Sequence, residues 1–347
     1  MTHAIVAEEL VRRFGATTAL DGVDLAVRTG SVFGLLGPNG AGKTTAVRIL
    51  ATLLRPDAGR ATVGGYDVLG QAHQVRQLVG LTGQYASVDE SLTGTENLVL
   101  IARLLGQPRP QAKRRAAELL ADFRLEDAAD RAAKTYSGGM RRRLDLAASL
   151  VGRPRVLFLD EPTTGLDPRS RNEMWDVIRR LVADGVTVLL TTQYLEEADQ
   201  LADEISVVDH GRVLATGTPE QLKARTGAQT LAVRPAHRVD LQTVVSTVAH
   251  LAGSVPEVRD TLVTAPVADP AVLPAVVRRL DDAGVLVAEL ALRGSSLDEV
   301  FLSLTGHRAE EPAVAPGSGT VDGSGRGGAD DSSDAEAADV RYEGSVA

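Results

Sequence analysis

A glycine-rich turn between an apolar run and a helical pattern is the feature that most constrains how this chain can fold. The turn, residues 37–44, reads Gly-Pro-Asn-Gly-Ala-Gly-Lys-Thr and follows the apolar run 32–36. After it, Val47, Leu50 and Leu54 recur at helical spacing. Successive backbone amides in such a turn form a concave anion site, and the start of a helix adds partial positive charge. A strand, this turn and a helix therefore predict an α/β fold with a nucleoside triphosphate site.

Two side chains of the turn have separate predicted roles. Lys43 reaches the β- and γ-phosphates, and the hydroxyl of Thr44 binds Mg²⁺. A structural turn with an incidental lysine is the alternative, but lysine is rare in this chain beside arginine. The residues expected to contact the nucleotide here are Gly37, Pro38, Asn39, Gly40, Ala41, Gly42, Lys43, Thr44 and Thr45.

A second apolar run ends in two adjacent carboxylates. Residues 156–159 read Val-Leu-Phe-Leu, and Asp160 and Glu161 follow directly. A triphosphate site of this kind needs an acid at a strand end to hold the Mg²⁺ shell, and Asp160 fits that role. Glu161 is then placed to polarise the attacking water. Alone, such an acidic pair is moderate evidence for a nucleoside triphosphate site. Together with Lys43 it is strong evidence.

Another anion site is predicted between these two motifs. Ser137, Gly138 and Gly139 precede a helical pattern, and a serine cap with two glycines makes a helix start that binds anions. One nucleotide does not need two such sites from one subunit. The sequence therefore predicts a head-to-tail dimer, in which each Ser-Gly-Gly closes over the partner's nucleotide.

Composition and charge limit the class of protein further. The 347 residues, 44% of them apolar, suffice for one large core or two smaller ones. The absence of cysteine excludes disulfides and thiolate metal sites. A net charge of −9 gives no signal for nucleic acid. No stretch is apolar and uncharged enough to cross a bilayer, and no signal peptide is expected.

The first part of the chain is expected to be the nucleotide-binding domain. Residues 1–225 alternate between strand and helix patterns, as in an α/β layer. The strand signals vanish over about 87–137, where an amphipathic helix is marked by Ala112, Ala116 and Leu119, and the helical part is expected to span about 87–150. This interruption predicts a helical subdomain.

The rest of the chain predicts two further regions. Residues 226–306 alternate on a smaller scale and indicate a C-terminal accessory α/β domain. Its last helix starts at a capping box of Ser296 and Glu299 and stops at Gly306. Residues 307–347 are acidic, with few large apolar side chains, and indicate a disordered tail.

Taken together, these motifs resemble those of the ATP-binding cassette (ABC) ATPases, whose signature is Leu-Ser-Gly-Gly-Gln. The resemblance covers residues 4 to about 220 and implies ATP and Mg²⁺ as ligands. It implies that Phe14 stacks on adenine, and that Gln84 reaches Mg²⁺ and senses a membrane partner. Gln193 stands where the family has its switch histidine. From the residues alone, Phe14 could instead belong to the core, and Gln84 could be a solvated loop residue.

The chain departs from the general family at two positions. Met140 replaces the signature glutamine, at small expected cost because Ser137 and Gly139 are intact. Gln193 keeps a donor for the γ-phosphate but cannot carry a proton as histidine does. The three arginines 141–143 are expected to solvate a helix face.

A closer resemblance links segments 84–90, 191–199 and 296–301 to the daunorubicin/doxorubicin-resistance type of ABC exporter ATPase. It extends to Gly306 and implies an ATPase coupled to transport, with Glu161 and Gln193 as catalytic residues. It also implies a separate integral membrane permease, a hydrophobic drug or antibiotic as cargo, and a peripheral place on the cytoplasmic face of the cell membrane.

Two other readings stay open at this stage. A lipid or polysaccharide exporter, or an importer, would use the same motifs. A soluble ABC protein acting on ribosomes or DNA is disfavoured: ribosomal members usually carry two cassettes, and DNA-repair members a long coiled coil with heptads that this chain lacks.

Overall fold

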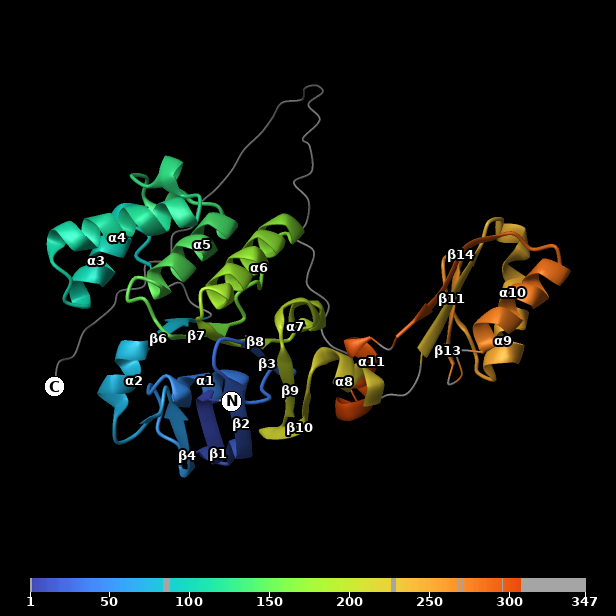
Figure 1. Ribbon diagram of the computed structural model, residues 1–347, viewed down its shortest axis with the longest axis horizontal. Helices are drawn as coiled ribbons and strands as arrows, with labels where there is room; N and C mark the ends of the chain where they lie inside the picture. The colour runs from blue at the N-terminus through green and yellow to red at the C-terminus, as the bar shows by residue number, and fades with distance from the viewer. Residues whose placement is uncertain are drawn as a thin grey trace, which may run out of the picture. The chain divides into compact units, whose positions relative to one another are not determined.

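A computed structural model describes residues 2–83, 88–225, 229–267, 269, 271–294 and 296–306 (Figure 1). One of its sheets has six strands in the order β10-β9-β3-β8-β7-β6. These strands are β3 (Val32–Leu36), β6 (Val79–Thr82), β7 (Val156–Asp160), β8 (Thr187–Thr192), β9 (Glu204–Asp209) and β10 (Arg212–Gly217). All neighbours except β9 and β10 run parallel. The carboxyl ends of β3, β7 and β8 therefore meet at one edge of the sheet.

The strands of this sheet are apolar along their length because both faces are covered. Every residue of β3, β7 and β8 is buried, as is typical of parallel strands between helices. Leu157 and Leu159 lie in one core cluster and Phe158 in the other, since successive side chains point to opposite faces. Figure 1 shows α5 (Gly138–Ser149) and α6 (Pro168–Ala183) on one side of the sheet, with α1 (Lys43–Leu50) on the other.

A second, antiparallel sheet adds to the cluster around Phe158. Its strand order is β2-β1-β4-β5, and it contributes Ile5, Leu10 and Val63. Its strands are β1 (His3–Phe14), β2 (Thr17–Arg28), β4 (Ala58–Val63) and β5 (Tyr66–Asp67). The short helices of this part of the chain are α2 (Ala72–Leu78), α7 (Leu195–Leu201) and α8 (Pro219–Arg225).

The expected helical insertion is present. Described residues 88–155 hold α3 (Gly94–Leu104), α4 (Arg109–Asp122), α5 and two short 3₁₀ turns, η1 (Glu126–Ala128) and η2 (Ala133–Thr135), and no strand. A full capping box starts α3: Thr93 accepts from the Glu96 amide, and the Glu96 carboxylate accepts from the Thr93 amide. The α/β fold with a helical insertion is confirmed.

The C-terminal part holds a four-stranded antiparallel sheet with its own core. Its elements are β11 (Gln229–Pro235), η3 (Arg238–Asp240), α9 (Leu241–Ala252), β12 (Glu257–Arg259), β13 (Leu262–Val267), α10 (Val272–Asp282) and β14 (Val287–Arg293). The sequence pattern predicts strands over 230–233, 261–264 and 285–292 and helices over 241–251 and 270–280, and it marks neither η3 nor β12. The three residues of β12 are all exposed, so no alternation of apolar side chains marked it.

The last helix, α11 (Leu297–Thr305), has the predicted cap and stop. Ser296 and Glu299 form both bonds of the capping box, and Gly306 has a φ of 74°. The helix contacts α7 and α8, and its buried Leu297, Val300 and Phe301 lie in the core cluster of α5 and α6. They are not part of the core formed by β11–β14. We expected this helix in the accessory domain, whereas its apolar face packs on the first part of the chain; the domain boundaries themselves stay a prediction.

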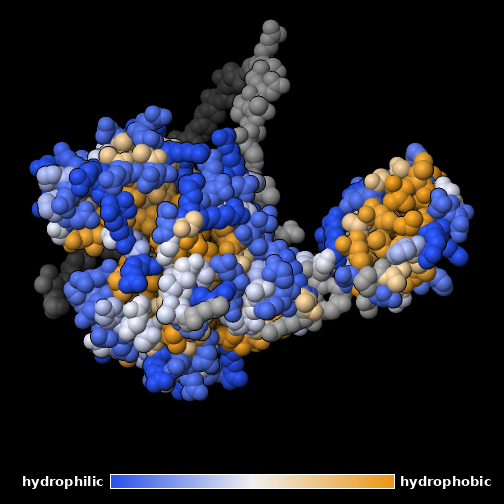
Figure 2. Space-filling model, viewed as in Figure 1, coloured by the Kyte–Doolittle hydropathy of each residue, from blue (hydrophilic) through white to orange (hydrophobic). Residues whose placement is uncertain are grey.

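No helix of the described residues is long and apolar enough to cross a membrane. Figure 2 shows hydrophilic residues over much of the face it presents, while apolar residues gather over the β11–β14 part. Exposed apolar side chains of that part include Val239, Val255, Val258, Val277 and Leu286.

The position of α11 predicts how a substitution in it affects unfolding. Phe301→Ala removes a side chain that is 2% exposed, so we expect a loss of about 3 to 5 kcal/mol. The only tryptophan, Trp175, lies in the same cluster, so its fluorescence during urea unfolding reports the change. Leu302→Ala, at a 39% exposed position, is the control. A Trp175 transition unchanged by Phe301→Ala would contradict the packing.

Candidate nucleotide site

The phosphate-binding turn lies between the end of β3 and the start of α1. Two of its positions must be glycine, because the backbone of other segments comes too close to leave room for a Cβ. A Cβ on Gly37 would lie 2.2 Å from the Val208 carbonyl oxygen, and one on Gly42 would lie 2.3 Å from that of Ala19. Gly42 also has a φ of 105°, which side chains rarely allow. The turn is therefore held in a shape that only this glycine pattern permits.

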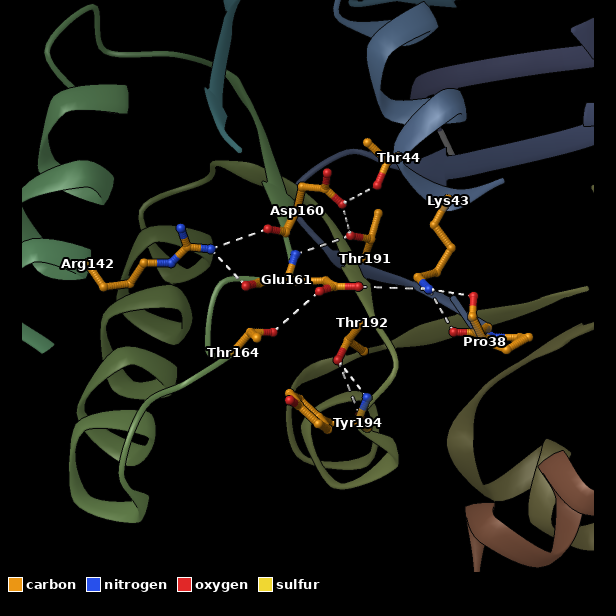
Figure 3. A network of polar contacts seen from close by, with 11 residues as sticks. Pro38, Lys43, Thr44, Arg142, Asp160, Glu161, Thr164, Thr191, Thr192 and Tyr194 are labelled. Atoms are coloured by element: carbon orange, nitrogen blue, oxygen red, sulfur yellow. Dashed lines mark hydrogen bonds and ion pairs between the residues drawn. The ribbon is translucent and has the colours of Figure 1, made fainter. Parts of the chain in front are cut away.

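Lys43 is the buried cation of this turn. Its side chain is 4% exposed, and Nζ donates to the carbonyl oxygens of Gly37 at 2.7 Å and Pro38 at 2.9 Å. The same Nζ lies 4.0 Å from Oε1 of Glu161. Figure 3 shows Lys43, at the start of α1, and Glu161, directly after β7, pointing toward one another. A positive charge and a carboxylate thus meet at the phosphate-binding turn.

Asp160 joins the turn to the end of β7. The Thr44 hydroxyl donates to its Oδ1 at 3.2 Å, and the Thr191 hydroxyl, from β8, donates to the same oxygen. A hydroxyl and a carboxylate side by side are the hard oxygen ligands that Mg²⁺ prefers, with phosphate and water completing the shell. No group of three or more acidic, histidine or cysteine side chains that could hold a metal occurs in the described part of the chain. The donor set fits an ion bound together with a nucleotide.

Glu161 has an unusual backbone that determines where its carboxylate points. Its φ is 51°, in the left-handed region that residues with side chains rarely adopt. The amide is held by the Thr191 carbonyl at 3.1 Å, and the Thr164 hydroxyl donates to Oε2 at 3.4 Å. The carboxylate faces the phosphate-binding turn as a result.

Phe14 is at the edge of the same site. It is 48% exposed and lines a cavity of about 280 Å³ with Glu161 and the residues of the turn from Asn39 to Thr45. The alternative that Phe14 belongs to the core is therefore wrong. Its ring is exposed beside the phosphate-binding turn, where an adenine could stack on it.

The Ser-Gly-Gly segment lies outside that small cavity. Ser137 caps α5 by accepting from the Met140 amide at 3.2 Å. Gly138 lines a wider cavity of about 690 Å³ that also contains Asn39, Glu161 and Gln193. A Cβ on Gly138 would meet nothing within 4 Å, so its backbone is open to a ligand.

Two further predicted residues have different outcomes. The Oε1 atom of Gln193 is buried and has no hydrogen-bond partner among the described residues, and its predicted role toward the γ-phosphate stays a prediction. Gln84 lies outside the described residues, so its predicted role stays a prediction.

Sequence reasoning was wrong about the arginines that follow. Arg142 is 14% exposed and binds backbone carbonyls beside the acidic pair instead of solvating a helix face. Arg141 bonds to Glu90, and Arg143 bonds to the Phe123 carbonyl. Nothing in the local pattern distinguishes the three, because the contacts of Arg142 come from residues remote in sequence.

Glu197 is another residue that the sequence did not single out. It lies on α7, fully buried, and Oε1 accepts from the Trp175 indole at 3.3 Å. Burial raises the pKa of Glu197 above its usual value, while interactions with Thr192, Thr163 and Trp175 lower it in part. It links the helix after Gln193 to α6.

Comparisons with known proteins show the family to which the chain belongs. The ABC transporter family pattern matches residues 20–164. The daunorubicin resistance ATP-binding protein DrrA2 of Streptomyces coeruleorubidus is 57% identical over 89% of this chain and 97% of its own length. The doxorubicin resistance ATP-binding protein DrrA of Mycobacterium tuberculosis (strain ATCC 25618 / H37Rv) is 49% identical over 84% of this chain and 89% of its own.

A more distant relative and a solved structure are also similar to this chain. The Nod factor export ATP-binding protein I of Ralstonia nicotianae is 40% identical over 89% of this chain and 96% of its own length. The structure of cbiO1 from Clostridium perfringens, part of an ABC transporter complex, has a TM-score of 0.60 at 26% identity. It covers 65% of this chain and 92% of its own. The chain belongs to the ATP-binding subunits of ABC transporters, in the drug-resistance ATP-binding protein family, and is an ATPase coupled to transport.

The buried Glu197 predicts a pH dependence of stability. An acid whose pKa is higher folded than unfolded binds more protons in the folded state, so the free energy of unfolding falls as pH rises above about 4.3. Glu197→Gln removes this titration. The free energy of unfolding of the variant therefore rises relative to that of the wild type, by about 1.4 kcal/mol for each pH unit between the unfolded and the folded pKa of Glu197.

Urea unfolding of both proteins between pH 5 and pH 8 measures the difference. Glu196→Gln, at a neighbouring side chain that is 68% exposed, is the control and should follow the wild type. A constant difference between Glu197→Gln and wild type over this range would show that Glu197 is ionised in the folded protein.

Proposed function

We propose that the chain binds MgATP at the carboxyl edge of its six-stranded sheet and hydrolyses it to drive export of a hydrophobic drug through a separate permease. The observation that carries the catalytic part is the convergence of Lys43, Thr44, Asp160 and Glu161 from two remote segments. The high identity to daunorubicin and doxorubicin resistance ATP-binding proteins supports the cargo.

Each residue of the site has a proposed role in hydrolysis. Lys43 binds the β- and γ-phosphates, and Phe14 stacks on adenine. Thr44, Asp160 and Gln84 would hold Mg²⁺, which neutralises charge on the phosphate oxygens when bound. Because its carboxylate faces the turn, Glu161 accepts the proton of the water that attacks the γ-phosphate.

Two copies of the chain are proposed to form each complete site. Gly138 lines the wide cavity and not the one beside Phe14, which supports the action of this segment on a partner's nucleotide. The positive end of α5 would stabilise the γ-phosphate from the far side. Gln193 would donate a hydrogen bond to the same phosphate when the two copies close.

The proposed membrane partner needs a docking surface, and α3 offers apolar side chains for one. Leu100, Leu104 and Leu105 are 47%, 78% and 56% exposed. Adjacent leucines left in water on a helical insertion are typical of a protein contact. This surface supports the proposal that the chain binds an integral permease at the cytoplasmic face of the membrane.

One relative suggests a second candidate cargo, a Nod factor. The Nod factor export ATP-binding protein I relative is 40% identical, against 57% for the daunorubicin resistance protein. The higher identity supports a hydrophobic drug or antibiotic as the cargo.

Replacing the proposed base should slow ATP hydrolysis without weakening ATP binding. We expect Glu161→Gln to lower kcat about 10²- to 10⁴-fold, because the amide cannot accept the proton, while ATP affinity is kept. Phosphate release and ATP binding are measured on the same preparation. The matched control is Glu118→Gln, which changes an acid on α4 away from the site. A wild-type kcat in Glu161→Gln would refute the proposal that Glu161 is the base.

Drug export is tested in cells that produce the chain together with a candidate integral membrane permease. We expect less daunorubicin to accumulate than in cells with the permease alone. Lys43→Ala should restore accumulation, because loss of the charge-assisted bonds to phosphate weakens ATP binding by about 1.5 to 3 kcal/mol per bond. Equal accumulation with wild type and Lys43→Ala would exclude this cargo.

A further inference from the structure

One arginine of α5 binds the backbone of the catalytic segment. Arg142 donates from Nε to the Pro162 carbonyl at 2.7 Å and from Nη2 to the Glu161 carbonyl at 2.7 Å. Nη2 also donates to the Asp160 carbonyl at 3.2 Å. Three successive carbonyls of the segment that carries the proposed base thus converge on one guanidinium, and Figure 3 shows the contacts with Asp160 and Glu161.

The backbone at this point needs such a partner. Glu161 has a φ of 51°, which is unfavourable for a residue with a side chain. Buried carbonyl oxygens also require donors, and the planar guanidinium offers five N–H groups in a fixed fork. Arg142 therefore stabilises the left-handed turn that directs the Glu161 carboxylate toward Lys43.

The same guanidinium reaches a third segment. Nη1 donates to the Gly83 carbonyl at 2.9 Å, at the end of β6 and directly before Gln84 in sequence. The Asp145 carboxylate, one helical turn along α5, lies 3.5 Å from Nη1 and is 1% exposed. Arg142 is held in place from its own helix and joins that helix to two loops at the edge of the sheet.

The position of Arg142 on α5 connects it to the other proposed half-site. Ser137 and Gly138 start the same helix, and Arg142 follows within two turns. A shift of the helix start would move the guanidinium, and the guanidinium binds the backbone of Glu161. The contact is a direct link between the segment proposed to act on the partner's nucleotide and the base for the subunit's own.

We propose that Arg142 is a positioning residue for hydrolysis, which fixes the backbone of residues 160–162 so that Glu161 faces the γ-phosphate. The proposal rests on the proposed role of Glu161 as the base. In this proposal Arg142 acts through the backbone of Glu161, so it sets the rate of hydrolysis and not the affinity for ATP.

The test compares kcat and ATP affinity in Arg142→Gln and Arg142→Lys. We expect kcat to fall about 10- to 100-fold in both, because a small displacement of a catalytic group has a cost of this order. Lysine keeps the charge but lacks the planar fork that spans three carbonyls. ATP affinity is expected to equal that of the wild type. Wild-type kcat in either folded variant overturns the proposal.

Chemical rescue separates positioning from a general loss of structure. Guanidinium ion at a concentration below that which unfolds the protein should restore part of the kcat of Arg142→Ala, and ammonium ion should not. Arg115→Gln is the matched control, because Arg115 is also half-buried, at 18% exposure, and bonds to the Leu150 carbonyl away from the site. If kcat and ATP affinity fall together in the Arg142 variants and guanidinium does not rescue, the role is structural and the proposal fails.

The double variant distinguishes this failure from failure of the base assignment. If Arg142 acts through Glu161, adding Arg142→Gln to Glu161→Gln lowers kcat little further. If the two substitutions instead lowered kcat independently of each other, the proposed action of Arg142 through Glu161 would be overturned. Wild-type turnover in Glu161→Gln alone would instead refute the base and leave the contact of Arg142 without a catalytic role.

Discussion

The parallel alignment of β3, β7 and β8 is the constraint on which the rest of the site depends. Parallel strands end at the same edge, so the phosphate-binding turn after β3 and the acidic pair at the end of β7 meet there. The hydrogen bond from the Thr44 hydroxyl to Asp160 fixes the two segments to each other, and Thr191 of β8 bonds to the same carboxylate. Three remote segments thereby become one site.

Burial gives this edge its electrostatic character. Lys43 and Asp160 are 4% and 3% exposed, and few charged side chains are tolerated at such depth without partners. Each is held by oxygen or hydroxyl groups of neighbouring segments, so the charges lie in fixed positions before a nucleotide arrives. Preorganised charge of this kind stabilises a phosphoryl-transfer transition state better than mobile charge in water.

The parts of the structure that the sequence predicted share one property. The glycine turn, the buried strand ending in Asp160 and the capping box at Ser296 are short patterns whose meaning lies within a few residues. The elements that were missed lack such a pattern: β12 has three exposed residues, and Arg142 is one of three consecutive arginines. For α11 the helix was predicted, but its packing on α7 and α8 was not, because an apolar face does not reveal what covers it.

The sequence by itself predicted the chemistry of the nucleotide site, since the turn needs glycine at 37 and 42 and the predicted ligands of phosphate and magnesium are Lys43, Thr44 and the acidic pair. Only the tertiary structure decided in which direction the carboxylate of Glu161, the proposed base, points. The left-handed backbone of Glu161 and the guanidinium of Arg142 come together only when α5 packs on the sheet. Contacts between segments remote in sequence depend on the folded path of the chain, and no local pattern encodes them.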